Sequence, residues 1–100
     1  MSAEAALTLC VQLWSKAGQD DALAAYEDAV LALIPEHGGT VVQRVRRSEP
    51  GDGPLEVQII TMPGRVALQS YLDDSRRLAL AASRELAVER TLMAEVVIVD

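Results

Sequence analysis

The chain has 100 residues and a mass of 10.8 kDa, which is room for one hydrophobic core, so we expect a single domain over residues 1–100. Apolar residues make up 50% of the chain and charged residues 24%, which is ordinary globular usage and excludes intrinsic disorder. The net charge of −6 repels phosphate backbones and anionic lipid surfaces, so we expect neither a nucleic-acid nor a membrane partner.

Aromatic and sulfur-containing residues are scarce. There is no Phe, and the aromatic set is Trp14, Tyr26 and Tyr71, too few for the stacking surfaces of single-strand nucleic-acid binders. Cys10 is the single cysteine, so neither an intrachain disulfide nor a cysteine metal cluster can form. No secretory leader and no apolar run of the ~20 residues that span a membrane is present. We therefore expect a cytoplasmic protein without a bound metal or cofactor.

The first half of the chain predicts a strand, a helix and a second strand. Apolar residues alternate over residues 7–13, which is typical of a strand. They recur at helical spacing over residues 19–36, and Gly38-Gly39 supplies the permissive backbone at the helix exit. Residues 40–48 then alternate again as a second strand.

The second half predicts a strand, one or two helices and a final strand. A turn rich in Pro and Gly over residues 49–54 leads into a third strand over residues 55–62. Residues 65–72 and 75–86 have helical spacing and could form two helices or one kinked helix. A last strand is predicted over residues 89–99, and its apolar end over residues 95–99 indicates burial on both faces.

This order predicts an α+β, ferredoxin-like split βαβ fold, a four-stranded antiparallel sheet with the helices on one face. An internal echo agrees with it. Ala22-Leu23-x-x-Tyr26-x-Asp28 recurs 45 residues later as Ala67-Leu68-x-x-Tyr71-x-Asp73, and Val11-Gln12 recurs 46 residues later as Val57-Gln58. Matches this short also arise by chance.

The alternation also divides the sheet into two faces. The face expected to pack on the helices carries the apolar members of each strand: Leu7, Leu9, Val11, Leu13, Val41, Val45, Leu55, Val57, Ile59, Leu92, Val96 and Ile98. The opposite face is expected to be mixed, with Trp14, Ile60, Met62 and Met93 beside Arg44, Arg46, Glu56, Gln58 and Glu95. A second copy packed sheet to sheet would bury its apolar members and let its charges pair, which predicts a homodimer.

The strand register follows from the charges. Because cross-strand neighbours share a face, Arg44 and Arg46 are better matched to the Glu56-Gln58 set than to an apolar one. We expect Arg46 opposite Glu56 and Arg44 opposite Gln58.

Several segments carry a family resemblance. They are Tyr26 and Val30 followed by Ile34-Pro35-Glu36-His37-Gly38-Gly39, then Ile59-Ile60-Thr61-Met62-Pro63 with Ala67 and Tyr71-Leu72-Asp73-Asp74, and finally Arg84. With these segments the chain resembles the dimeric α/β barrel superfamily, and within it the small one-domain proteins of unknown function. The resemblance implies that two sheets pack face to face into a barrel, with a cavity between sheet and helices or at the barrel mouth.

Five residues are candidates for a site. His37, the single histidine, could be a catalytic acid or base, or could simply favour the helix end. The substrate-binding candidates are Trp14, Tyr26, Arg44 and Tyr71. Trp14 could instead anchor a dimer, the tyrosines could be core residues, and Arg44 could either hold a carboxylate or form an ion pair across an interface.

Two functions fit these observations. The first is a small homodimeric binding or accessory protein with a small cavity for an organic ligand. The wider superfamily that the chain resembles includes cofactor-independent monooxygenases, isomerases and haem-dependent proteins. The second is therefore a cofactor-independent monooxygenase or isomerase acting on a small, partly apolar substrate.

Overall fold

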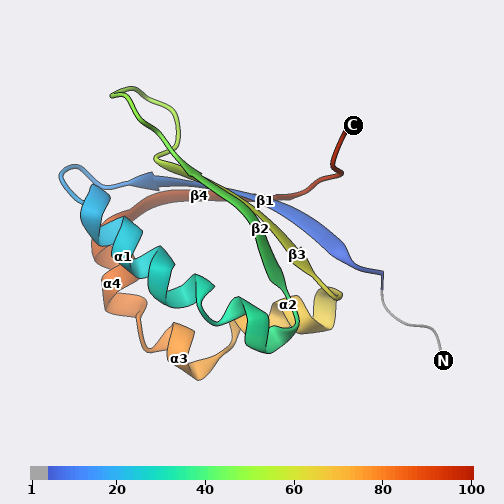
Figure 1. Cartoon of the computed structure of the whole chain (residues 1–100). Helices are drawn as coiled ribbons and strands as arrows, with labels where there is room; N and C mark the ends of the chain where they lie inside the picture. Colours follow the sequence, from blue (N-terminus) through green and yellow to red (C-terminus); the bar gives the residue numbers. More distant parts are fainter. Residues whose placement is uncertain (1–4) are drawn as a thin grey trace.

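A computed structural model describes residues 5–100 of the chain. Its elements in order are β1 (Leu7–Ser15), α1 (Asp20–Leu31), η1 (Ile34–His37), β2 (Thr40–Arg46), β3 (Glu56–Met62), α2 (Arg65–Leu72), α3 (Ser75–Leu78), α4 (Ala81–Ala87) and β4 (Val88–Glu95). The strands form an antiparallel sheet in the order β2-β3-β1-β4, and the helices all lie on one face of it (Figure 1). The predicted ferredoxin-like α+β fold is confirmed.

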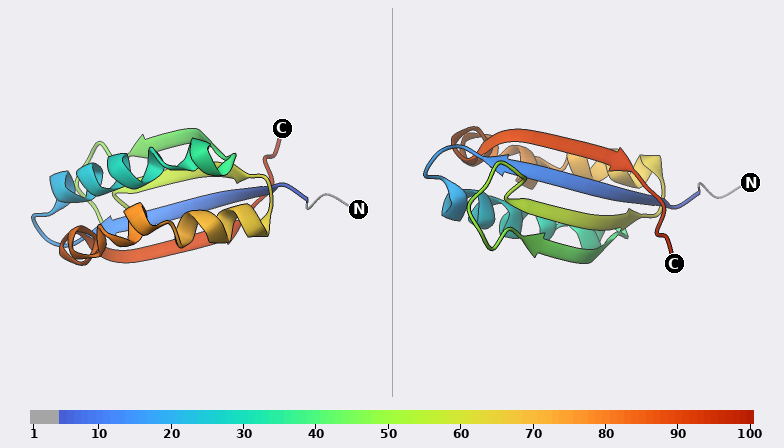
Figure 2. Two further views of the ribbon diagram at one scale, coloured as in Figure 1. Left: turned by 90° about the horizontal axis from the view of Figure 1, so that it is seen from below. Right: turned by 90° about the horizontal axis from the view of Figure 1, so that it is seen from above.

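The helices form two rows beneath the sheet (Figure 2). One row is α1 and η1, which divide the predicted helix 19–36 in two. Pro35, which lacks an N–H, falls in the first turn of η1, a 3-10 helix. The other row is α2, α3 and α4. Of the two predictions for this segment, separate helices over residues 65–72 and 75–86 agree better with the structure than one kinked helix. Asp74 caps α3 by accepting a 2.9 Å hydrogen bond from the Arg76 backbone N–H.

The end of β4 differs from the prediction. The strand stops at Glu95, and the expected burial of residues 95–99 is wrong: Val97 is 82% exposed and Val99 85%. The last backbone bond to β1 joins Val96 N–H to the Thr8 carbonyl at 2.9 Å. Because β1 begins at Leu7, the tail has no strand beside it among residues 5–100.

The register prediction is confirmed, since Arg46 lies opposite Glu56 and Arg44 opposite Gln58. The prediction of which face they occupy is wrong. Cross-strand pairs place Glu56 beside Leu13 and Gln58 beside Val11, and the β1 members of these pairs point to the helices. The inner face of β3 is therefore Glu56, Gln58, Ile60 and Met62, all buried.

The residues expected inside on these strands lie outside. Val57 and Ile59 share the helix-free outer face with Val45, and Leu92 of β4 points the same way because it pairs with Gln12. Arg44, Arg46 and Glu56 consequently form their ion pairs within one chain, and the expected pairing of these charges across a dimer interface is wrong.

The turn between η1 and β2 is tightly packed. Gly38 adopts a φ of 79°, the left-handed conformation that glycine favours, and ends η1. At Gly39 the limit is space, because an added Cβ would meet Met62 Sδ and would lie 2.8 Å from the Thr61 carbonyl oxygen. This close approach joins the first helical row to the end of β3.

We expect Gly39→Ala to destabilise the fold by about 1–3 kcal/mol, because the methyl group overpacks a site bounded by backbone. Chemical denaturation measures the effect. Gly51→Ala is the matched control, since nothing lies within 4 Å of a Cβ at that loop position. Equal stability of the two variants would contradict this packing.

A cavity between the sheet and the helices

A cavity of about 230 Å³ lies between the inner face of the sheet and the two helical rows. Its apolar wall comes from β1, β3 and β4 and from α1, η1 and α2: Leu9, Val11, Leu13, Val30, Ile34, Ile60, Met62, Leu68, Leu72 and Met93. Its polar lining comes from both helical rows and from β3 and β4: Tyr26, Glu27, Gln58, Tyr71, Arg77, Arg84 and Thr91. The cavity therefore combines an apolar body with convergent polar groups, which is typical of a small-molecule site.

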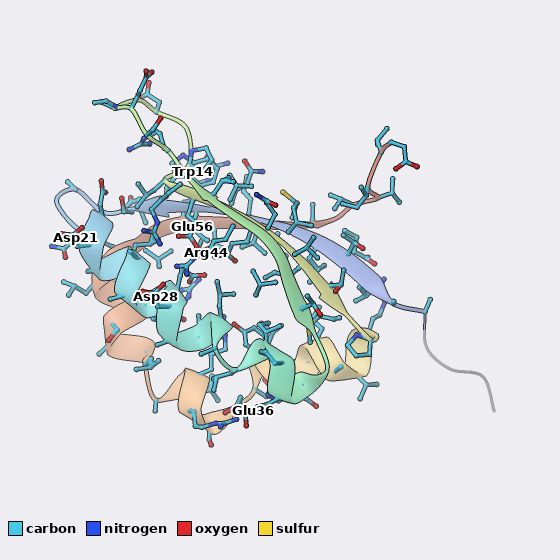
Figure 3. The ribbon with its side chains drawn as sticks, in the orientation of Figure 1. Trp14, Asp21, Asp28, Glu36, Arg44 and Glu56 are labelled. Carbon is cyan, nitrogen blue, oxygen red and sulfur yellow. The ribbon has the colours of Figure 1, made fainter. Side chains whose placement is uncertain are left out.

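A buried polar chain begins at the cavity wall and runs toward β2. Gln58 Nε2 donates to Glu27 Oε1 at 2.7 Å and to Glu56 Oε2 at 2.6 Å, and all three side chains are buried. Glu56 also accepts hydrogen bonds from Arg44 Nε at 2.7 Å and from Arg46 Nε at 3.0 Å. Figure 3 shows Arg44 and Glu56 between the sheet and α1, near Asp28, whose Oδ1 lies 2.6 Å from Arg44 Nη1.

The two carboxyl groups of this chain have opposite electrostatics. Burial disfavours the charge of Glu56, but hydrogen bonds from Arg44, Gln58 and Arg46 outweigh it and hold its pKa below the usual range. Burial raises the pKa of Glu27, because its hydrogen bond from Gln58 is a smaller effect and the charge of Glu56 adds to the shift. Glu56 is thus the ionised partner of the arginines, and Glu27 is a buried carboxyl whose charge the surroundings disfavour.

Both helix tyrosines line the cavity. Tyr26 of α1 is 4% exposed and Tyr71 of α2 is 6% exposed, so both are also core residues. Burial raises the pKa of Tyr71 to about 12, against the opposing hydrogen bond and charge of Arg77. Both phenols therefore stay neutral at physiological pH and can act as hydrogen-bond donors.

Two arginines of the second helical row complete the lining. The Arg77 guanidinium lies 5.3 Å from the centre of the Tyr71 ring, and its Nη1 donates a long bond of 3.4 Å to the Leu72 carbonyl. Its Nε is buried and has no hydrogen-bond partner. Arg84 Nη2 reaches Thr91 Oγ1 at 3.4 Å. Among residues 5–100 neither guanidinium forms an ion pair with a carboxylate, unlike Arg44 and Arg46.

The other candidate residues lie away from the cavity lining. His37 Nε2 is 2.8 Å from Asp74 Oδ2, and its ring packs edge-on to Tyr71 with the centroids 5.9 Å apart. Hydrogen bonds from Arg76 and then from His37 hold the pKa of Asp74 well below its usual range. Trp14 points to the outer face, where its Nε1 donates to the Asp52 carbonyl at 3.0 Å and Arg90 stacks 4.7 Å from its ring. Arg44 is joined to the site only through Glu56 and Gln58.

Three further lining residues were not predicted from the sequence as site residues: Glu27, Gln58 and Arg77. Glu27 had a readable signal, since it falls on the apolar stripe of α1 between Leu23 and Val30. The inward position of Gln58 could be predicted only from the strand register. No sequence pattern around Arg77 indicates that it lines a cavity. No group of three or more potential metal ligands occurs within the described part of the chain, and none of its helices has the length and apolarity needed to cross a membrane.

The opposite electrostatics of the two carboxyl groups predict opposite effects of amide substitution. Glu27→Gln should stabilise the protein at neutral pH. The folded-state pKa of Glu27 is raised, so its ionisation weakens folding by up to about 1.4 kcal/mol per pH unit above the ordinary value of 4.5. Below pH 4.5 the carboxyl is protonated in both states and the gain should vanish.

Glu56→Gln should instead cost about 1–3 kcal/mol at neutral pH, because two guanidinium groups lose their anion. The pKa of Glu56 is lowered in the fold, so this cost is present above pH 4.5 and shrinks as the pH falls through the folded-state value. Urea unfolding between pH 4 and 8 measures both variants, with exposed Glu89→Gln as the control. A neutral-pH loss for Glu27→Gln as large as that for Glu56→Gln would contradict the assignment.

Comparison with known proteins supports the fold. No protein-family model matches the chain, and no curated protein matches it in sequence. Among solved structures, it is similar to a dabb family protein with a ferredoxin-like fold from Mesorhizobium loti. That match has a TM-score of 0.67 and 16% identity, and it covers 97% of this chain and 100% of the other.

Two further structures are similar over nearly their whole length. One is a dimeric protein of unknown function with a ferredoxin-like fold from Bacteroides fragilis, with a TM-score of 0.70, 9% identity and coverage of 95% and 98%. The other is SnoaB, a cofactor-independent oxygenase from Streptomyces nogalater, with a TM-score of 0.70, 12% identity and coverage of 96% and 95%. At these identities the likeness is one of fold: the chain has the ferredoxin-like fold of small proteins, several of them of unknown function.

Proposed function

We propose that this protein is a small homodimeric binding or accessory protein of the cytoplasm, whose cavity between sheet and helices holds a small, partly apolar organic molecule. The observation that carries the proposal is the cavity itself. Its volume of about 230 Å³ exceeds the ~150 Å³ that holds benzene in an engineered protein cavity, so there is room for one substituted ring. Natural interiors are otherwise closely packed, and a space of this size lined by convergent polar groups is unlike an ordinary packing defect.

We expect benzene to raise the melting temperature of the wild-type protein, because a ligand that binds only the folded state stabilises it by mass action. Leu68→Phe should abolish the shift, since Leu68 lines the cavity and the larger ring occupies the space. Leu78→Phe, the same change at an α3 position that is 55% exposed, should leave the shift intact. Scanning calorimetry with and without benzene measures all three proteins. A shift that persists in Leu68→Phe, or one absent from the wild type, would refute the cavity as a binding site.

The homodimer is supported by the outer face of the sheet. This face carries Cys10, Val45, Val57, Ile59 and Leu92 beside the polar Gln12, Gln43 and Thr61, and no helix of residues 5–100 covers it (Figure 2). The loop between β2 and β3 and the apolar C-terminal tail both rise on this side and frame it (Figure 1). An uncovered apolar sheet face of this kind needs a partner. A second copy fits, as in the similar Bacteroides fragilis structure, which is described as dimeric.

We expect Ile59→Glu to convert a dimer into a monomer, because the substitution places an unpaired charge at the middle of the outer face. Sedimentation velocity at micromolar concentration measures the change as a halved mass. Leu78→Glu, on an exposed turn of the helical side, should remain dimeric. A monomeric wild-type protein would overturn the dimer and leave the cavity proposal standing.

A cofactor-independent oxygenase or isomerase is the second candidate. The observation that favours it is Glu27, a buried carboxyl with a raised pKa that lines the cavity, which is the environment of many general acids and bases. The similar SnoaB structure is described as a cofactor-independent oxygenase. In this reading Glu27 exchanges a proton with the bound molecule, and the Tyr71 hydroxyl donates a hydrogen bond to it. His37 does not line the cavity and reaches it only through Tyr71, against whose ring it packs, so in this reading its effect on the bound molecule is indirect.

A further inference from the structure

We infer that the cavity binds small apolar carboxylates, with the ring of the ligand against the leucine wall and its carboxylate paired with Arg77 and Arg84. This inference rests on the proposed binding function and names the chemical class of the ligand. It assigns an anion site to two arginines that form no ion pair within the described chain.

The lining carries an excess of positive charge. The charged groups of the cavity are two guanidinium groups, from Arg77 and Arg84, against one carboxyl group, from Glu27. At least one positive charge is therefore uncompensated, and burial, which raises the pKa of Glu27, disfavours the charge of that carboxyl. The whole chain carries −6, yet among residues 5–100 no carboxylate forms an ion pair with Arg77 or Arg84, whereas Arg44, Arg46 and Arg76 each have one. Arg77 is half-buried, and a positive charge in such a place is costly unless an anion accompanies it; Arg84 is exposed and offers that anion a second donor.

Arg77 is incompletely hydrogen-bonded. Its Nε is buried without an acceptor, its Nη1 makes a long 3.4 Å bond to the Leu72 carbonyl, and its other side-chain hydrogen bond is to Tyr71. Buried N–H groups without partners are rare in proteins, because each costs free energy. A carboxylate can accept from two N–H groups of one guanidinium at once, and a modest rotation of the Arg77 side chain would exchange one long bond for two charge-assisted ones.

The remainder of the cavity is mostly apolar. Its lining includes Leu9, Ile60, Met62, Leu68 and Leu72. Such a wall desolvates a hydrocarbon ring but offers nothing to a sugar or to a second charged group. The volume of about 230 Å³ limits the ligand to one substituted ring or a short branched acid.

Benzoate, benzamide and benzamidine test the inference, because they have nearly the same shape and carry a negative charge, no charge and a positive charge. Isothermal titration calorimetry at pH 7 should show benzoate binding at least tenfold more tightly than benzamide, and benzamidine binding most weakly. Arg77→Gln should weaken benzoate binding at least tenfold and leave benzamide binding unchanged. Arg47→Gln is the control, since that side chain bonds the Gly53 carbonyl in the loop after β2, away from the cavity.

The outcomes separate the inference from the proposal beneath it. Equal affinity for benzoate and benzamide, or an unchanged benzoate affinity in folded Arg77→Gln, would overturn the carboxylate site while the cavity still binds. If benzamidine binds most tightly, the carboxylate site is also overturned, and the polar part of the cavity would be an ionised Glu27 that binds cations. Failure of all three compounds, together with no effect of benzene, would overturn the proposed function as well. If Arg77→Gln does not fold, the ranking of the three compounds on the wild-type protein decides the question.

Discussion

A fully buried carboxylate beneath the sheet determines which way β3 faces, and much of the structure follows from it. Glu56 has no exposed surface, and its two oxygens accept from Arg44, Arg46 and Gln58. A charge in this position is tolerable only when it is fully paired, so β2 and β3 must keep the register that brings the arginines to it. The same register turns Val57 and Ile59 to the opposite face. The polar network inside and the apolar surface outside are thus two consequences of one pairing.

The network also shapes the cavity. Gln58 fills an inner position of β3 where an apolar residue would pack on α1, and it needs an acceptor there, which Glu27 provides. Burial raises the pKa of Glu27, and the negative charge of Glu56, which shares the Gln58 amide with it, adds to that shift. The absence of phenylalanine matters at this point, because the surrounding leucines and valines are too small to fill the space between the two helical rows. An unfilled volume with a polar end is the result.

The sequence predicts the order of elements, the ferredoxin-like fold and the Arg46–Glu56 pairing, because these depend on local periodicity and on charge matching between adjacent strands. The orientation of β3 and β4 could not be predicted in the same way. Alternation defines two faces for each strand but does not say which face packs on the helices. The rule that apolar residues turn inward predicted Val57 and Ile59 on the helix side, where the structure has Glu56 and Gln58. That rule fails here because β3 carries a buried polar network on its inner side and apolar residues on its outer side. Arg77 lines the cavity because α3 packs under the sheet. Such a long-range arrangement leaves no local pattern in the sequence from which the position of Arg77 could be predicted.

The two repeated segments of the sequence do not take equivalent positions in the structure. The difference makes the cavity lining asymmetric. Tyr26 and Tyr71 occupy equivalent helix positions and both line the cavity. The Val-Gln pairs of the strands are inverted, because Val11 and Gln58 point inward while Gln12 and Val57 point outward. The acid of the lining comes from the first half, on α1, and both arginines come from the second, on α3 and α4. Apolar packing alone would hold a ring in either orientation. A ligand with one charged end meets unlike groups from the two halves, so the broken symmetry of the halves favours one orientation of the bound molecule.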